Sequence, residues 1–85
     1  MTERKSGAAG GYILFGTSAC HLCELAEELL QGCPELVFEK VDISDSDLLF
    51  ERYGVRIPVI KAPGGSELGW PFDAAQLNIF LVQSS

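Results

Sequence analysis

The chain has 85 residues, with twelve acidic against six basic side chains, a net charge of −6 and an apolar fraction of 47%. A chain of this length forms one domain, and its balance of apolar and charged residues is typical of a folded globular protein. The acidic excess excludes a basic surface for phosphates, and no apolar run reaches the roughly 20 residues of a membrane helix, so we expect neither nucleic acid nor a membrane as a partner.

The beginning of the chain is small, polar and rich in glycine and alanine. We therefore interpret residues 1–10 as a flexible leader and residues 11–85 as the folded domain. The leader lacks the apolar core of a secretory signal. The three cysteines are also too few, and odd in number, for a secreted fold built on disulfides. The expected location is the reducing cytoplasm, where cysteines are catalytic, metal-binding or core residues.

The first half of the chain predicts a strand, a helix and a second strand. Residues 12–15 form a short apolar run between glycines, which suits a strand buried on both faces. The predicted helix begins near Cys20 and ends at Gly32. Its apolar residues recur at helical spacing, and we expect them to form the buried stripe: Leu22, Leu25, Ala26, Leu29, Leu30 and Cys33. Residues 36–43 predict the second strand, and the charged pair Glu39-Lys40 places it at a sheet edge.

After the second strand the sequence predicts a short helix and a hairpin. Residues 44–47 offer several N-cap side chains for a helix through Tyr53, and Gly54 supplies its end. Residues 59–61 and 67–68 flank a segment rich in proline and glycine. This pattern predicts a hairpin, whose strands are antiparallel.

The chain ends in a third predicted helix. Asp73 is its expected N-cap, and Gln76 stands where it completes a capping box. Phe72 and Leu77 are spaced to form the accompanying hydrophobic staple. The element order is therefore β-α-β-α-β-β-α, in which the first two strands are parallel. We expect an α/β fold with a four-stranded mixed sheet and helices on both faces.

The strongest local motif is Cys20-His21-Leu22-Cys23, which opens a helix directly after a buried strand. Helical geometry at this spacing brings two sulfur atoms within bonding range, so the pair can close a small disulfide ring. Cys20 at the helix N-terminus faces unsatisfied N–H groups, which stabilise the attacking thiolate. A protonated His21 would add a positive charge that tunes this thiol, whereas the glutamates of the helix oppose it. We interpret the pair as a redox dithiol.

Two other interpretations of a C-x-x-C motif are a metal site and two cysteines that simply pack. A zinc site would need two more ligands, and Cys33 is a poor candidate. It lies thirteen residues after Cys20, which is about 20 Å along a helix. Cys33 also falls on the apolar stripe, where we expect a core residue. The sequence therefore predicts no metal site.

A second motif, Val55-Arg56-Ile57-Pro58-Val59, puts a proline at the start of a strand. This motif follows the C-x-x-C motif, and precedes Gly64-Gly65, in the order seen in glutaredoxins and thioredoxins. From residue 12 to the last helix, the sequence resembles a short glutaredoxin-like protein of the thioredoxin superfamily. The resemblance implies a thioredoxin-like (glutaredoxin-like) fold.

The resemblance also implies roles for individual residues. Cys20 would be the nucleophile, Cys23 the buried resolving thiol, and Pro58 the cis-proline of the family, packed opposite the dithiol. The backbone of Ile57 would then be free to pair with an extended substrate as an added strand. The neighbouring Arg56 is the cation that we expect to meet an anionic substrate, with a solvated surface charge as the alternative.

These motifs predict a thiol–disulfide oxidoreductase in which Cys20 attacks a substrate disulfide and Cys23 then releases the product. We expect a monomer without a tightly bound cofactor, which acts on a disulfide-containing protein or a low-molecular-weight thiol. The reducing system would be glutathione, a candidate co-substrate, or a thioredoxin-reductase-like partner. The alternative is a non-catalytic or iron–sulfur-carrying module on the same fold.

The sequence departs from typical glutaredoxins where that family binds glutathione. His21 and Leu22 replace the usual proline and aromatic residue, and residues 17–19 lack the usual basic residue. Near the last helix, an aromatic pair replaces small and acidic residues. We expect Trp70 and Phe72 to anchor the hairpin to that helix, with a substrate-contacting aromatic patch as the alternative. The resemblance thus supports an oxidoreductase fold more strongly than glutathione binding.

Overall fold

The computed structural model describes residues 9–34 and 36–84. Its elements are β1 (Ala9–Gly16), α1 (His21–Gln31), β2 (Leu36–Asp42), the short 3-10 helix η2 (Ile43–Asp45), α2 (Asp47–Tyr53), β3 (Val59–Lys61), β4 (Glu67–Gly69) and α3 (Ala74–Ser84). The predicted order β-α-β-α-β-β-α is confirmed. β1 begins at Ala9, inside the segment predicted as a leader, and residues 1–8 of that segment lie outside the described residues.

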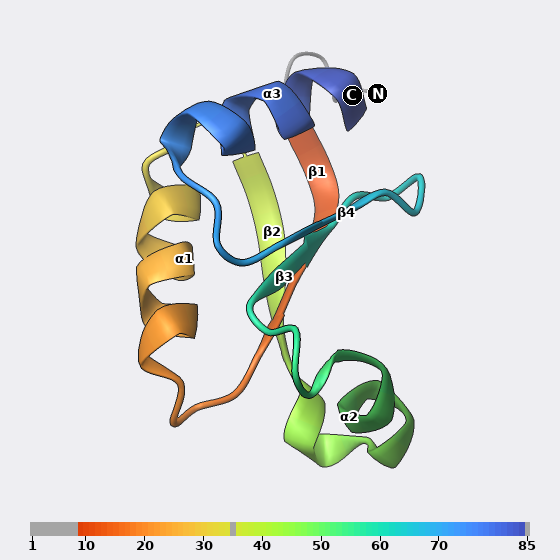
Figure 1. Ribbon diagram of the computed structural model, residues 1–85. Helices are drawn as coiled ribbons and strands as arrows, with labels where there is room; N and C mark the ends of the chain where they lie inside the picture. The colour runs from red at the N-terminus through yellow and green to blue at the C-terminus, as the bar shows by residue number, and fades with distance from the viewer. Residues whose placement is uncertain (1–8, 35, 85) are drawn as a thin grey trace.

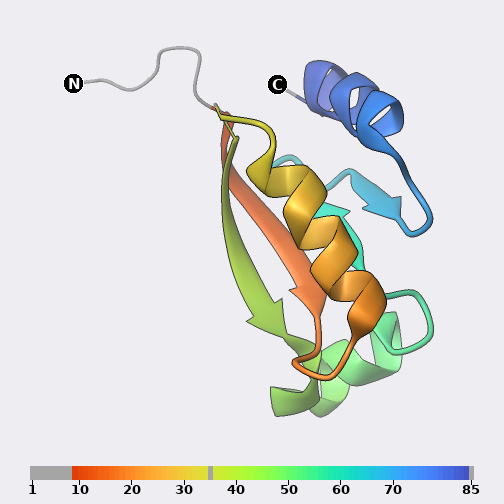
Figure 2. The same cartoon turned by 90° about the vertical axis from the view of Figure 1, so that its left-hand side faces the viewer.

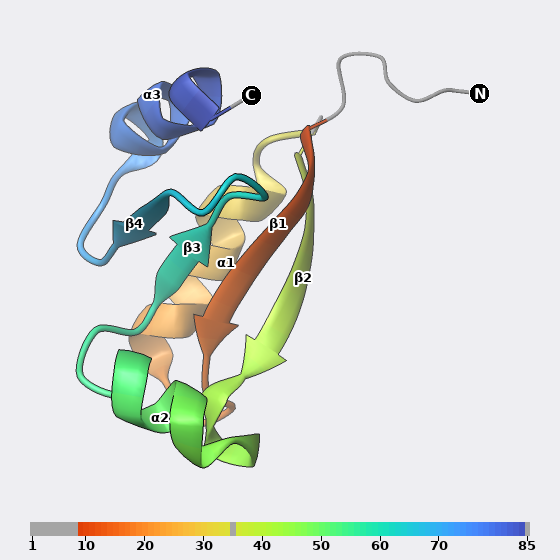
Figure 3. The same ribbon diagram turned by 90° about the vertical axis from the view of Figure 1, so that its right-hand side faces the viewer.

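The strands form one four-stranded mixed sheet in the order β2-β1-β3-β4 (Figure 1). β1 is parallel to β2, whereas β3 is antiparallel to both β1 and β4. β2 is therefore an edge strand, as its charged residues predicted. Figures 2 and 3 show α1 lying across one face of the sheet, with α2 and α3 at opposite ends of the molecule.

Two groups of buried side chains occupy the two faces of the sheet. Because side chains alternate along a strand, Leu14 and Phe15 of β1 face opposite sides. The larger cluster lies between the sheet and helices α1 and α3, and contains Tyr12, Leu14, Ala26, Leu30, Leu36, Ile60, Ala62, Phe72, Leu77 and Phe80. The smaller cluster contains Phe15, Ile43, Tyr53 and Val59. Since Tyr53 belongs to α2, helices pack on both faces, as predicted.

α1 buries a narrower stripe than its sequence predicts. Ala26 and Leu30 are fully buried, whereas Leu22 and Leu25 are 44% and 36% exposed. The expectation that every apolar residue of α1 faces the core is wrong for these two leucines. A helix presents one residue to a flat sheet about every third or fourth position, and Cys23 takes the remaining place on this face.

Cys33 lies just beyond the C-terminal end of α1. It is a free cysteine, half-buried against the larger cluster, and its thiol donates to the carbonyl of Leu29 (3.8 Å). The expectation of a fully buried core residue is therefore too strong, because Cys33 packs against the core without being enclosed by it.

Side-chain caps fix where α2 and α3 begin. The hydroxyl of Ser46 accepts the N–H of Leu49 at the start of α2 (3.3 Å). At the start of α3, the carboxylate of Asp73 accepts the N–H of Gln76 (2.8 Å), and the side chain of Gln76 accepts the N–H of Asp73 (3.0 Å). This reciprocal pair confirms the predicted capping box. No helix in the described part of the chain is both long and apolar enough to cross a membrane.

Trp70 and Phe72 connect the hairpin to α3. Phe72 is buried, Trp70 is half-buried, and their rings meet edge-to-face with centroids 5.1 Å apart. Both rings pack within or against the larger cluster, which also contains Leu77 of α3. This packing is the anchoring role that the sequence predicted.

Candidate redox site

The two cysteines of the C-x-x-C motif lie at the start of α1, after the loop that leaves β1. Cys20 is the N-cap of the helix, and its sulfur accepts a hydrogen bond from the N–H of Cys23 (3.0 Å). This N–H is one of those that a helix leaves without an internal partner. Cys20 and Cys23 form a disulfide, with their Cα atoms 5.1 Å apart. The predicted closeness of the two sulfur atoms is therefore confirmed.

The two cysteines differ in exposure. Cys23 is only 7% exposed and faces the interior, whereas Cys20 is half-buried. A partner can therefore approach the sulfur of Cys20 more easily than that of Cys23. His21 follows Cys20 as the first residue of α1, and its side chain is exposed.

Gly16, the last residue of β1, leaves the space that Cys23 occupies. A Cβ atom built on Gly16 would lie 2.8 Å from the sulfur of Cys23 and 3.1 Å from its Cβ. Any larger residue would therefore displace the cysteine or the strand. Sequence reasoning missed this role, although a glycine in a buried strand often marks a close approach.

The sheet brings the proline motif to the same end of β1. The β1–β3 ladder ends with Phe15 opposite Val59. Gly16 follows Phe15 in β1, and Pro58 precedes Val59 of β3, so both residues lie just beyond this end of the ladder. Pro58 is fully buried, and the Ile57–Pro58 peptide bond is cis. Because Gly16 also lies against Cys23, the two sequence motifs lie at the same end of the β1–β3 ladder.

The backbone of Ile57 is only partly available to a substrate strand. Its N–H donates to the carbonyl of Tyr53 (3.1 Å), which also accepts the N–H of Arg56 (2.8 Å). The expectation that the Ile57 backbone is free is therefore wrong for its N–H, because the turn that follows α2 uses this donor. The side chain of Ile57 packs against the smaller cluster.

Arg56 belongs to a polar network that the sequence did not reveal. Its guanidinium lies 3.2 Å from the carboxylate of Glu67, which also accepts the hydroxyl of Tyr53 (2.6 Å). The guanidinium of Arg52 is 3.9 Å from the same carboxylate. Arg52 and Arg56 both lie close to the Tyr53 ring, 5.5 and 5.6 Å from its centroid. Arg56 is thus a surface cation, with its side chain 47% exposed, that also pairs with Glu67.

The same contacts shift the pKa values of two residues in this network. The hydrogen bond from Tyr53, together with the guanidinium of Arg56, lowers the pKa of Glu67 below its ordinary 4.5. Burial, together with the hydrogen bond to Glu67, raises the pKa of Tyr53 above its ordinary 10.0. At neutral pH, Glu67 is therefore a charged acceptor and Tyr53 a neutral donor.

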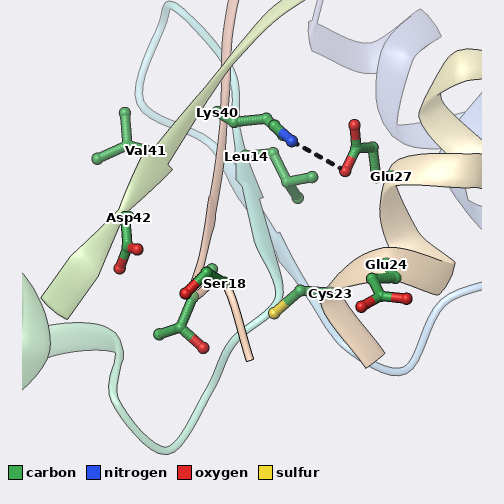
Figure 4. Close-up of a pocket in the computed structure, with 10 residues that line it drawn as sticks. Leu14, Ser18, Cys23, Glu24, Glu27, Lys40, Val41 and Asp42 are labelled. Carbon is green, nitrogen blue, oxygen red and sulfur yellow. Dashed lines mark hydrogen bonds and ion pairs between the residues drawn. The ribbon is translucent and has the colours of Figure 1, made fainter. Parts of the chain in front are cut away.

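A pocket of about 450 Å³ lies beside the buried cysteine (Figure 4). It is lined by Leu14, Gly16, Thr17, Ser18, Cys23, Glu24, Glu27, Lys40, Val41 and Asp42. Figure 4 shows Lys40 reaching from β2 toward α1, where it forms an ion pair with Glu27 (3.2 Å). The hydroxyl of Ser44 donates to Asp42 (2.6 Å) and lowers the pKa of that carboxyl. Cys23 thus lines a cavity that mixes apolar and charged side chains, which sequence reasoning did not anticipate.

The described residues contain no group of three or more His, Cys, Asp or Glu side chains that could hold a metal ion. Cys33, the third cysteine, lies past the opposite end of α1 from Cys20.

The model of the glutaredoxin-like domain family (DUF836) matches residues 12–81. Among solved structures, the X-ray structure of XcR50 from X. campestris is 39% identical, with a TM-score of 0.83 over 88% of this chain and 100% of that one. The solution structure of XcR50, also 39% identical, gives a TM-score of 0.79 over 87% of this chain and 95% of that one. No protein with a curated description matches the sequence.

A more distant likeness concerns the fold alone. The oxidised thioredoxin from Plasmodium falciparum has a TM-score of 0.60 at 19% identity, over 87% of this chain and 80% of that one. It confirms the predicted thioredoxin-like architecture. The family match extends from β1 into α3 and includes both the C-x-x-C motif and Pro58. The chain therefore belongs to the glutaredoxin-like domain family (DUF836) of proteins with a thioredoxin-like fold.

Proposed function

We propose that this protein is a thiol–disulfide oxidoreductase that reduces or exchanges disulfides through Cys20 and Cys23. The observation that carries the proposal is the disulfide at the start of α1, with Cys20 half-buried and Cys23 buried behind it. A sulfur at a helix N-terminus is stabilised as a thiolate, which is the reactive form. The family and the fold support the same role.

The reaction begins from the reduced dithiol. The thiolate of Cys20 attacks one sulfur of a substrate disulfide, forms a mixed disulfide and expels the other substrate sulfur as a thiolate. Cys23 loses its proton and attacks the sulfur of Cys20, which releases the second substrate thiolate and closes the Cys20–Cys23 bond. Two electrons pass from the dithiol to the substrate, whose two thiolates take up protons. In the disulfide, the N–H of Cys23 lies 3.0 Å from the Cys20 sulfur, a position from which it would stabilise the thiolate formed on reduction.

Replacement of each cysteine by serine tests this mechanism. We expect Cys20→Ser to abolish reduction of a model disulfide such as insulin, and Cys23→Ser to accumulate a mixed disulfide visible by mass spectrometry. Cys33→Ser is the matched control, because Cys33 is a free cysteine at the far end of α1. Full reductase activity in both Cys20→Ser and Cys23→Ser would refute the proposal.

The reductant is a separate part of the proposal. Glutathione is anionic, and the two arginines that precede Pro58, Arg52 and Arg56, already lie against Glu67. This pairing favours a thioredoxin-reductase-like partner over glutathione as the source of electrons. Reduction of the Cys20–Cys23 bond should be followed with glutathione and with thioredoxin reductase and NADPH in parallel. Faster reduction by glutathione would reverse this preference, and a disulfide that neither system opens would contradict a reductase role.

A further inference from the structure

We infer that Glu67 is a positioning residue that fixes the loop 54–58, which carries Ile57 and Pro58, next to the dithiol. The inference rests on the proposed oxidoreductase function. It concerns a residue of β4 that lies outside both sequence motifs. Support for this inference comes from the contacts that the loop makes with its surroundings.

Tyr53 fixes the first end of the loop 54–58. Its carbonyl accepts the N–H groups of both Arg56 and Ile57, at 2.8 and 3.1 Å. Tyr53 is 1% exposed, and its ring stacks on Phe15 with centroids 4.4 Å apart and 15° between the planes. Because Phe15 lies at the end of β1 that leads to the dithiol, this stack fixes the loop relative to that strand.

Glu67 fixes the loop at a second point. One carboxylate oxygen accepts the hydroxyl of Tyr53 (2.6 Å), and the other accepts the guanidinium of Arg56 (3.2 Å). The side chain of Glu67 is only 16% exposed, and β4 pairs with β3 directly after the loop. Hydrogen bonds to a charged group are stronger than those between neutral groups. The carboxylate of Glu67 therefore binds both Tyr53, which precedes the loop, and Arg56, which precedes Ile57 within it.

This arrangement affects substrate binding rather than the sulfur chemistry. A substrate strand that pairs with the carbonyl of Ile57 binds more tightly if that group is already in place, because less of the loop is ordered on binding. Cys20 and Cys23 make none of the contacts of Glu67 that are described above. Loss of the carboxylate should therefore raise KM and leave the reactivity of the Cys20 thiolate unchanged.

The test uses an uncharged peptide disulfide as substrate, so that the altered charge does not act on it directly. For Glu67→Ala we expect KM to rise by about fivefold or more, with kcat within about twofold of wild type. The rate at which iodoacetamide alkylates reduced Cys20 should not change. Tyr53→Phe, which loses only the hydroxyl, should raise KM in the same direction by a smaller factor. Glu39→Ala, at an exposed glutamate of β2, is the matched control and should behave as wild type.

An unchanged KM in Glu67→Ala would overturn the inference, and so would a fall in alkylation rate that accounts for the loss of activity. Amide hydrogen exchange gives a readout independent of turnover: exchange at Arg56 and Ile57 should accelerate in Glu67→Ala. If Glu67→Ala does not fold, Tyr53→Phe must show both the raised KM and the faster amide exchange. If Tyr53→Phe shows neither, the inference is wrong. A wild-type protein that reduces no disulfide would refute the proposed function, whereas faster loop exchange would still support the positioning.

Discussion

Gly16 lies so close to Cys23 that its missing side chain is part of the redox site. A methyl group at this position would come within 2.8 Å of the cysteine sulfur. β1 has little freedom to move away, because it lies between β2 and β3 in the sheet. The position of the buried sulfur thus depends on a residue that has no reactive group.

Gly16→Ala is therefore expected to impair both folding and redox chemistry. The added methyl should lower the free energy of unfolding by about 1–3 kcal/mol, as overpacking of a close-packed interior does. It should also shift the equilibrium between the dithiol and the disulfide, because Cys23 must move. Urea unfolding and titration against glutathione measure the two effects. Gly64→Ala is the control, since its Cβ would meet nothing within 4 Å. Equal stability of the two variants would contradict the prediction.

Two leucines of α1 should respond very differently to substitution. Leu30 is 0% exposed, so Leu30→Ala is expected to cost about 2–5 kcal/mol of unfolding free energy. Leu25 is 36% exposed, so Leu25→Ala should cost less than about 1 kcal/mol. Chemical denaturation of both variants provides the comparison. A large loss in Leu25→Ala would mean that this side chain is enclosed in solution.

These leucines also show which part of the fold the sequence could predict. Helix and strand order followed from local periodicity, and the capping box from two residues three positions apart. Periodicity did not reveal that α1 presents only a narrow face to the sheet, because Leu22 and Leu25 fit a broader helical stripe equally well. Only packing against the sheet distinguishes them from Ala26 and Leu30.

The candidate site also has a part that the sequence could predict and a part that it could not. Cys20, Cys23 and Pro58 belong to short motifs, so sequence patterns identified them. The contact between Gly16 and the dithiol, and that between Tyr53 and Glu67, join residues that only the sheet brings together. No local spacing encodes such pairs, because they depend on strand register. For the same reason, the carboxylate partner of Arg56 was not predicted.

The capping box of α3 should contribute measurable stability. Asp73→Ala removes the acceptor for the N–H of Gln76 and should cost about 1 kcal/mol of unfolding free energy. Asp73→Asn keeps an acceptor oxygen and should retain most of this stability. Thermal unfolding monitored by circular dichroism compares the two variants. If Asp73→Ala melts at the wild-type temperature, the hydrogen bond contributes nothing.

Glu67 should make stability depend on pH in the acid range. Its pKa in the folded protein is below the ordinary 4.5, chiefly because of the hydrogen bond from Tyr53. The folded state therefore favours the carboxylate. This stabilisation is complete above the unfolded pKa and is lost as the pH falls through the folded pKa.

Comparison with Glu67→Gln isolates this contribution. The difference in unfolding free energy between wild type and Glu67→Gln should be largest near neutral pH and should shrink as the pH falls below 4.5. When Tyr53→Phe is added to both proteins, the pH-dependent part of this difference in unfolding free energy should decrease. The Tyr53 hydrogen bond, which is the largest cause of the lowered Glu67 pKa, is then absent. Urea unfolding at a series of pH values measures all four proteins. A difference that stays constant from neutral to acid pH would argue against this assignment.

The ladder between β1 and β3 has a consequence for how variants of this protein should be interpreted. It consists of the pairs Ile13–Lys61, Leu14–Ile60 and Phe15–Val59, and it joins the segment that carries the sulfurs to the segment that carries the proline. A substitution that weakens this short ladder would separate the cysteine segment from the proline segment while leaving every cysteine intact. Genetic screens for lost redox activity should therefore recover changes at Val59 and Ile60 alongside those at Cys20.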